Sequence, residues 1–160
     1  MTGNRKQWRE RKRPLHNRIL GYTTTPTLVF LTVCSDKRKR IFANGDASQV
    51  LLNAWQRAES WQVGRYVIMP DHIHLFCAPI RESVPLRQWV SFWKSLASRR
   101  WPNPADHPVW QRDFWDTQLR QGDRYAQKWE YVRHNPVRHG LVGDPEEWPY
   151  QGEMNSLSWG

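Results

Sequence analysis

The stretch Tyr66-Val-Ile-Met-Pro-Asp-His-Ile-His-Leu-Phe-Cys-Ala-Pro79 decides the fold expected for this chain. It contains two apolar, strand-like runs, at 66–69 and 73–78, joined by a turn-forming Pro-Asp pair. His72 and His74 stand two residues apart at the second run. In an extended strand such side chains leave the same face, about 6–7 Å apart. Two imidazoles could therefore converge on one cation; the alternative is that one or both are ordinary core or surface histidines.

Size and composition suggest a basic, single-domain protein. A chain of 160 residues is long enough for one domain with a real core. The formal charge of +9 favours a polyanionic partner, and eleven Trp beside many Arg and Lys suit base stacking and cation–π contact. No apolar run approaches the length of a membrane span, and no signal peptide is evident. We therefore expect a cytoplasmic, nucleoid-associated protein without a membrane partner. Cys34 and Cys77 are expected to be buried, reduced thiols.

The pattern of apolar residues alternates between strands and helices. A β-rich run at 28–34 predicts a central strand, and helical spacing follows at 46–60, with Asp46 as its expected N-cap. The two runs quoted above come next. Helical spacing returns at 83–100, with Ser83 as a possible cap, and 109–116 reads as a short strand or extended connector.

The last predicted helix spans 123–135 and should end before Pro136, and the chain from Gly143 onward looks irregular. This order predicts an α+β fold, a ferredoxin-like sandwich in which helices pack on a mostly antiparallel sheet. We expect three parts: a basic N-terminal arm at 1–14, one catalytic domain at 15–150, and a C-terminal tail at 151–160.

The last predicted helix offers partners for the two histidines. Tyr131 and Asn135 lie four residues apart, so both should project from one helix face. The Asn135 carbonyl could complete a His-His-oxygen site for a divalent ion, while the tyrosine attacks a phosphodiester. Alone, this pair is weak evidence, because Tyr131 could equally be a half-buried helix aromatic and Asn135 a helix terminus.

Four motifs in order resemble the REP-associated tyrosine transposases, bacterial relatives of the single-tyrosine His-hydrophobe-His transposases that act on single-stranded DNA. They are Met69-Pro-Asp-His-Ile-His74, Trp110-Gln-Arg-Asp-Phe-Trp-Asp116, Tyr131-Val-Arg-His-Asn-Pro-Val-Arg-His-Gly-Leu-Val142 and Trp148-Pro-Tyr150. The similarity runs over roughly 28–150. It is the ordered set that makes the resemblance specific.

The resemblance implies a metal-dependent endonuclease and strand transferase. His72, His74 and Asn135 match the positions that bind Mg²⁺ or Mn²⁺, and Tyr131 matches the nucleophile that becomes joined to a 5′ phosphate. The implied partners are single-stranded DNA hairpins of REP type with an adjacent guide tetranucleotide. Since one tyrosine handles one strand at a time, we expect two chains to act together, as a homodimer or a transient pair. His134 and His139 flank the same motif and could compete for the ion or assist proton transfer.

The remaining basic and aromatic residues are candidates for binding DNA. Phosphate contacts are expected from the arm, and base stacking from two tryptophans that are also candidate core residues. The predicted DNA-binding residues are Arg11, Lys12, Arg13, Arg99, Arg100, Trp101, Arg112, Trp115, Arg133 and Arg138. Two alternatives stay open at this stage. One is a sequence-specific hairpin-binding protein without cleavage activity, and the other is a metal-dependent phosphodiesterase that uses water as its nucleophile.

Overall fold

The computed structural model describes residues 28–81, 83–120 and 122–157. The arm predicted at 1–14, with Arg11, Lys12 and Arg13, lies outside the described residues. Among the helices of the described ranges, none combines the length and apolarity that crossing a membrane requires.

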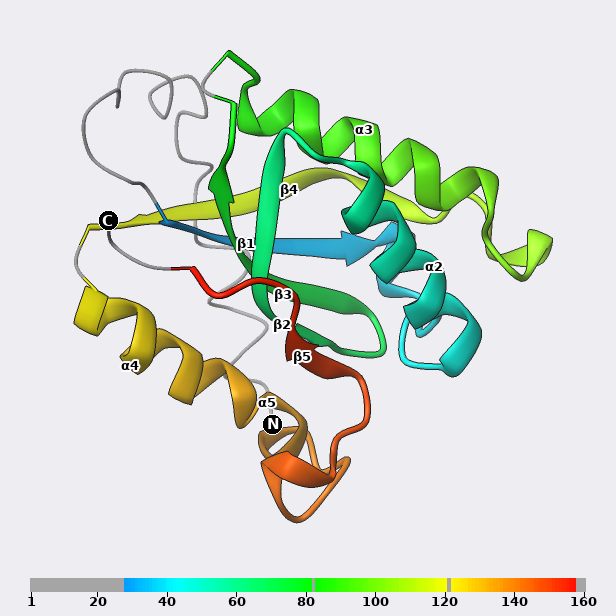
Figure 1. The fold of residues 1–160 in the computed structure, drawn as a ribbon. Coiled ribbons are helices and arrows are strands. Elements are labelled where there is room, and N and C mark those ends of the chain that lie inside the picture. The colour runs from blue at the N-terminus through cyan, green and yellow to red at the C-terminus, as the bar shows by residue number, and fades with distance from the viewer. Residues whose placement is uncertain (1–27, 82, 121, 158–160) are drawn as a thin grey trace.

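A five-stranded sheet forms the centre of the molecule (Figure 1). Its strands lie in the order β4-β1-β3-β2-β5, and every neighbouring pair is antiparallel. The strands are β1 (Leu28–Ser35), β2 (Trp61–Ile68), β3 (His72–Pro79), β4 (Trp110–Leu119) and β5 (Gln151–Glu153).

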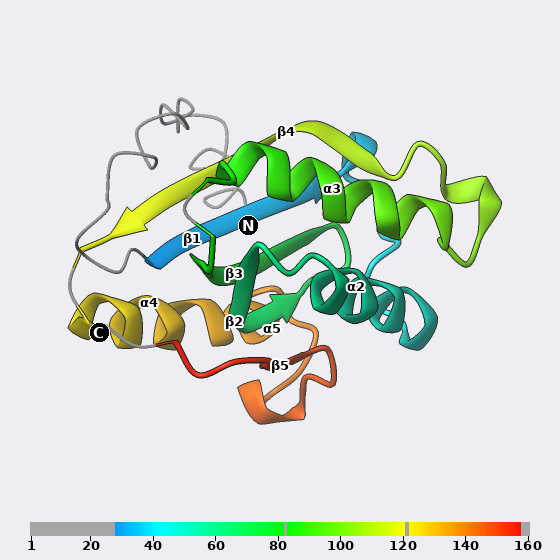
Figure 2. The same cartoon turned by 45° about the horizontal axis from the view of Figure 1, so that its top comes forward.

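Helices cover both faces of this sheet (Figures 1 and 2). On one face, α2 (Gly45–Arg57) and α3 (Leu86–Arg99) lie side by side. On the other face lies α4 (Gly122–Arg133), followed directly by the single turn α5 (Asn135–Arg138). Within the described ranges there are also three short 3₁₀ turns, η2 (Asp36–Arg38), η3 (Pro104–Asp106) and η4 (Pro145–Glu147).

The alternation of side chains along β1 and β3 divides the core into two clusters. Val29, Leu31 and Val33 point toward α2 and α3, where they join the larger cluster. Leu28 and Phe30 point the other way and join the cluster beneath α4. Because both faces are covered, β1 and β3 can be buried along nearly their whole length, which explains why apolar residues point to both sides of each strand.

The predicted ferredoxin-like α+β sandwich is confirmed. The elements β1, α2, β2, β3, α3 and β4 follow the predicted strand–helix–strand–strand–helix–strand order. Cys34 and Cys77 are buried free thiols, as predicted.

Several predicted boundaries are wrong. The cap of α2 is Asn44, whose side chain accepts a hydrogen bond from the Ala47 N–H at 2.8 Å, whereas Asp46 lies inside the first turn. Helix α3 begins after Pro85 rather than at Ser83, since the proline fixes the extended backbone that precedes the helix. Strand β4 continues to Leu119, beyond the predicted end at 116.

The C-terminal part of the chain is more ordered than its sequence indicates. The predicted helix over 123–135 ends at Arg133, and Pro136 lies in the first turn of α5, where a proline is tolerated. The tail expected to be irregular contains η4 and β5, and β5 pairs with β2 through Tyr66 and Gly152. The sheet therefore extends into the predicted tail.

Candidate active site

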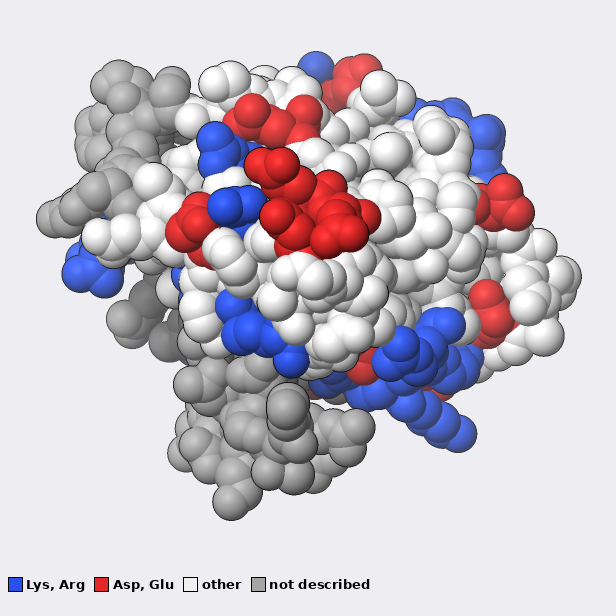
Figure 3. Space-filling model, turned by 90° about the horizontal axis from the view of Figure 1, so that it is seen from below, with Lys and Arg blue, Asp and Glu red and all other residues white. Residues whose placement is uncertain are grey.

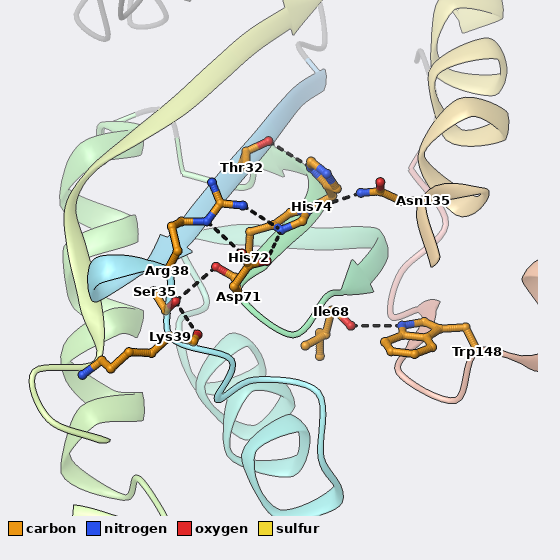
Figure 4. A network of polar contacts seen from close by, with 10 residues as sticks. All are labelled: Thr32, Ser35, Arg38, Lys39, Ile68, Asp71, His72, His74, Asn135 and Trp148. Carbon is orange, nitrogen blue, oxygen red and sulfur yellow. Dashed lines mark hydrogen bonds and ion pairs between the residues drawn. The ribbon is translucent and has the colours of Figure 1, made fainter. Parts of the chain in front are cut away.

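His72 and His74 lie side by side on the face of β3 that α4 covers. Both are almost fully buried, and their ring centroids are 4.7 Å apart. The His74 ring stacks on Phe30 of β1, and its Nδ1 lies 3.0 Å from the Thr32 hydroxyl (Figure 4). Thr32 is directly opposite His74 in the register of β1 and β3. The two-residue spacing thus places both imidazoles on one face, as the sequence predicts.

Asp71 orients the ring of His72. Its Oδ1 lies 2.8 Å from His72 Nδ1, at the tight turn between β2 and β3. A carboxylate can only accept here, so Nδ1 carries the proton and Nε2 carries the lone pair. That Nε2 faces the side-chain amide of Asn135, whose Nδ2 is 3.2 Å away (Figure 4). A carboxylate, an imidazole and a potential ligand position are therefore aligned in the arrangement common at histidine metal ligands.

Burial keeps both histidines neutral near pH 7. Burial lowers the pKa of His72, although the hydrogen bond and charge of Asp71 oppose this. Burial lowers the pKa of His74 well below its usual value, and His72, Lys128 and Arg138 lower it further. Neutral imidazoles are the form that binds metal ions. Although burial alone would raise it, the pKa of Asp71 is lowered by its hydrogen bonds and charge interactions with His72 and Arg38.

Asn135 and Tyr131 reach this site from the helical side, but they are not equivalent. Asn135 is 4% exposed and contacts His72, whereas Tyr131 is 49% exposed. The Tyr131 ring lies under the Arg138 guanidinium, with 3.9 Å from Cζ to the ring centroid, and 5.6 Å from Lys128 Nζ. The phenol is therefore accessible and contacts two cations that also lower the pKa of His74, while the Asn135 amide lies against His72.

Trp148 attaches this helical side to the sheet. Its indole N–H donates to the Ile68 carbonyl at 3.0 Å, and the Ile68 N–H donates to the Tyr150 carbonyl at 2.8 Å. Just before it, the Leu141 N–H donates to the Pro136 carbonyl at 2.9 Å, which closes the chain behind α5. The segment that follows α5 thus helps to hold Asn135 against β3.

The residues present fit a divalent metal ion. In the described ranges no group of three or more His, Cys, Asp or Glu side chains could hold an ion, so the third protein ligand would have to come from another residue type. His72 and His74 have Nδ1 engaged by Asp71 and Thr32, so both would bind through Nε2. Asn135 would supply its oxygen after its amide turns by 180°, which exchanges the two nearly isosteric ends.

Two bacterial proteins resemble this chain in sequence. A Haemophilus influenzae protein whose name assigns it to the REP-associated tyrosine transposases is 29% identical over 111 residues, which cover 58% of this chain and 63% of the relative. The REP-associated tyrosine transposase of Escherichia coli K12 is 24% identical over 96 residues, 59% of this chain and 56% of the relative. The chain thus matches less than two thirds of either relative's length. No model of a known protein family matches the chain.

A solved structure shares the fold. The structure of a REP-associated tyrosine transposase bound to a REP hairpin superposes with a TM-score of 0.68 at 21% identity, and the match covers 81% of this chain and 78% of the other. The chain is therefore similar in sequence and in fold to REP-associated tyrosine transposases. The motifs containing the paired histidines and the asparagine meet on the α4 face, and Tyr131 lies four residues before Asn135.

Only part of the predicted DNA-binding set lies at the candidate site. The guanidinium of Arg138 lies over the Tyr131 ring. Trp115 is half-buried on β4 and lies opposite Thr32 of β1, which in turn lies opposite His74 of β3. Arg112 is exposed on β4. Arg133 pairs with Glu130 at 2.9 Å, and the His134 ring lies 2.7 Å from the Glu130 carbonyl, so both contact an exposed residue near the end of α4.

Three predicted residues lie on the opposite side of the sheet. Arg99 and Arg100 are exposed at the C-terminal end of α3. The prediction that Trp101 stacks on DNA bases is wrong. Trp101 is 6% exposed, its indole N–H donates to Asp106 at 2.8 Å, and its ring packs against Phe42. A tryptophan buried in this way has no face to offer a base, so the core interpretation holds for it.

The sequence interpretation missed three contributors to the site: Thr32, Lys128 and Arg38. Thr32 interrupts the apolar run from Leu28 to Cys34, which is the signal that could have found it. Lys128 Nζ lies 4.8 Å from the Phe30 ring and occupies the helix position one turn before Tyr131. Arg38 contacts the Asp71–His72 pair across 33 residues of sequence, and nothing local indicates that contact.

Proposed function

We propose that this protein is a metal-dependent strand transferase that binds single-stranded DNA hairpins of REP type and cleaves them through a 5′-phosphotyrosine at Tyr131. The observation that carries the proposal is the meeting of His72, His74 and Asn135, together with an accessible phenol that contacts the same two cations, Lys128 and Arg138, that act on His74. A purely DNA-binding protein needs no such set. The bound relative is consistent with a hairpin partner, and the guide tetranucleotide remains a prediction from the family resemblance.

The chemistry assigned to the chain is a transesterification. Tyr131 Oη attacks the phosphorus, the Oη–P bond forms as the phenolic proton departs, and the P–O3′ bond breaks to leave a protonated 3′-hydroxyl. A bound divalent ion would neutralise a non-bridging phosphate oxygen and orient the scissile bond. Arg138 and Lys128, which flank the ring, would hold the phosphate near the phenol. Because the energy of the bond is conserved in the phosphotyrosine, another 3′-hydroxyl can reverse the step.

Charge on this side of the molecule supports a polyanionic substrate. Burial and the charges of Arg138, Arg38 and Arg40 lower the pKa of His139, against the opposing charge of Asp71. These three arginines therefore lie close to His139, whose ring centroid is 6.2 Å from that of His72. Seen from below, Lys and Arg form a dense group at one edge of the view, and others lie around a central group of acidic residues (Figure 3). Such a concentration of positive charge favours phosphate binding.

The ion is expected to be Mg²⁺ or Mn²⁺, with Mn²⁺ bound more tightly. Imidazole ligands favour the softer transition metals, while the amide oxygen suits both ions. Two copies of the chain, together in a homodimer or only during catalysis, would each process one strand. The cytoplasmic, nucleoid-associated location follows from the same proposal.

A covalent-adduct experiment tests the proposal. The protein is incubated with a 3′-labelled single-stranded hairpin and Mg²⁺ or Mn²⁺, then denatured and separated by electrophoresis. We expect a labelled protein band that is absent in Tyr131→Phe and retained in Tyr150→Phe, a matched tyrosine control outside the site. His72→Ala and His74→Ala should lose cleavage and keep most of their hairpin affinity.

The alternatives give different results in the same experiment. A hairpin-binding protein without activity gives a retarded complex but no cleavage. A phosphodiesterase that uses water cleaves the strand without an adduct, and its rate survives Tyr131→Phe. Either result would refute the assignment of Tyr131 as nucleophile.

A further inference from the structure

The turn η2 holds two consecutive residues in the left-handed region. Lys37 has φ 55° and ψ 23°, and Arg38 has φ 56°. Neither is a glycine, and side chains with a Cβ are strained in this conformation. Strain of this kind persists only where surrounding contacts impose it, and it concentrates at functional sites.

Hydrogen bonds on both sides of η2 impose this conformation. The Ser35 hydroxyl lies 2.6 Å from the Lys39 carbonyl and 3.2 Å from the Asp71 carbonyl, and the Ser35 N–H donates to the same Asp71 carbonyl at 3.1 Å (Figure 4). Lys39 Nζ donates to the Pro108 carbonyl at 2.8 Å. The turn is therefore tied to the β2–β3 turn and to the segment before β4.

The consequence of this anchoring is the position of the Arg38 side chain. Arg38 Nε donates to Asp71 Oδ2 at 3.1 Å, while Asp71 Oδ1 accepts from His72 Nδ1 at 2.8 Å. Both oxygens of one carboxylate are thus engaged, one by Arg38 and the other by the imidazole. Asp71 is only partly exposed and Arg38 somewhat more so, so the attraction between them contributes little stability. Its effect is geometric, because a carboxylate bound at both oxygens cannot rotate.

We propose that Arg38 is a positioning residue that fixes the Asp71 carboxylate and thereby keeps the proton of His72 on Nδ1 and the lone pair of Nε2 toward Asn135. Arg38 Nη2 also lies 3.4 Å from His72 Nδ1. If Asp71 turned away, this donor would favour the other tautomer, in which Nε2 carries the proton and cannot bind a metal ion. The role of this tautomer in metal binding rests on the proposed function. The effect of Arg38 on the tautomer of His72 does not depend on it.

The matched variants are Arg38→Met and Arg40→Met. Both remove one positive charge from the same segment, and Arg40 is exposed. Loss of a nearby positive charge alone should strengthen binding of a cation, so Arg40→Met should bind Mn²⁺ as well as the wild type or better. Loss of positioning should weaken it, and we expect about tenfold weaker Mn²⁺ binding for Arg38→Met. The two effects have opposite signs.

The experiment has two readouts on the full chain. Long-range ¹H–¹⁵N NMR spectra of the metal-free protein above pH 7 report the His72 tautomer, and titration calorimetry reports the affinity for Mn²⁺. We expect His72 Nδ1–H in the wild type and in Arg40→Met, and a mixture of tautomers in Arg38→Met. Arg38→Lys keeps the charge but replaces the planar fork, and should show the same change to a smaller extent.

An unchanged His72 tautomer in Arg38→Met, together with Mn²⁺ affinity equal to that of Arg40→Met, would overturn the proposal. If Arg38→Met does not fold, Arg38→Lys decides the question with the same readouts. If the wild type binds no Mn²⁺, the metal-dependent function fails, while the tautomer spectra still decide whether Arg38 positions His72.

Discussion

Asp116 provides a quantitative test of the electrostatics of the fold. It lies on β4 opposite Leu31, on the face covered by α2 and α3, and is 3% exposed. Burial raises its pKa from 3.8 to about 6, although Arg87 opposes the shift. Between pH 6 and 3.8 the folded protein binds a proton that the unfolded chain does not, so the contribution of Asp116 to stability improves as pH falls. Above pH 6 the ionised form destabilises the fold by about 3 kcal/mol.

The buried histidines act in the opposite direction. Burial lowers the pKa of both His72 and His74, so the unfolded chain binds protons that the folded protein does not. Their contribution to stability is complete above pH 6.5 and is lost as pH falls. For each histidine that stays neutral in the folded protein, the free energy of unfolding falls by about 1.4 kcal/mol per pH unit below pH 6.5. In the wild type, Asp116 therefore masks part of the acid sensitivity of the site.

The substitution Asp116→Asn separates the two effects. Asparagine resembles the protonated acid, so we expect the variant to be more stable than the wild type by about 3 kcal/mol at pH 7. Its advantage should shrink by about 1.4 kcal/mol per pH unit below pH 6 and nearly vanish at about pH 4. Urea unfolding followed by tryptophan fluorescence at pH 7, 6, 5 and 4 measures the difference. Glu59→Gln, at an exposed carboxyl group, is the control and should leave the pH dependence unchanged.

A constant difference between Asp116→Asn and the wild type across this pH range would refute the reasoning. A variant less stable than the wild type at pH 7 would do so as well, because it would mean that the ionised carboxylate is stabilised in the folded protein. A third variant, His74→Gln, should reduce the loss of stability below pH 6.5, since it removes one group that must stay neutral.

Three further predictions address other parts of the molecule. Trp148→Phe removes the donor to the buried Ile68 carbonyl, so the free energy of unfolding in urea should fall by about 1–3 kcal/mol. Amide hydrogen exchange in this variant should be faster around η4 than around α2. Gly64→Ala should cost about 1–3 kcal/mol, because the added methyl group would lie 2.6 Å from Leu157 Cδ1; the same substitution at Gly45, which has open space, is its control. Removal of residues 1–13 should weaken hairpin binding and flatten its dependence on salt, as fluorescence anisotropy at several salt concentrations would show, and an unchanged slope would exclude the arm from binding.

The sequence predicted the elements whose signal is local. Strand β1 and the β2–β3 pair are apolar runs, and α2 and α3 show a helical period, so their existence followed from periodicity alone. Strand β5 was missed because Gln-Gly-Glu has no alternation and owes its conformation to backbone pairing with β2. The break between α4 and α5 was misplaced because a proline can begin a helical turn as well as end one.

The candidate site shows the same limit. The two histidines are two residues apart in one strand, and their common face follows from the geometry of any strand. Their partners Thr32 and Arg38 lie more than thirty residues away, and only the packed sheet brings them near. The family motifs supplied Tyr131 and Asn135, but spacing alone suggested that they share a face. The structure instead buries the Asn135 side chain against His72 and leaves the Tyr131 side chain about half exposed.

That difference between Asn135 and Tyr131 has a physical origin in the smaller core cluster. Helix α4 is held on the sheet by the contacts of Tyr125 and Trp129 with Phe76, and by burial of Val132. The histidines belong to the central strand of the sheet, whose opposite face is supported by the larger cluster. The position of the phenol relative to the imidazoles therefore depends on a few aromatic contacts, while the imidazoles themselves are fixed by most of the core. Alignment of Tyr131, the proposed nucleophile, should consequently be the more easily perturbed property, and substitutions beneath α4 should impair the proposed cleavage before they unfold the domain.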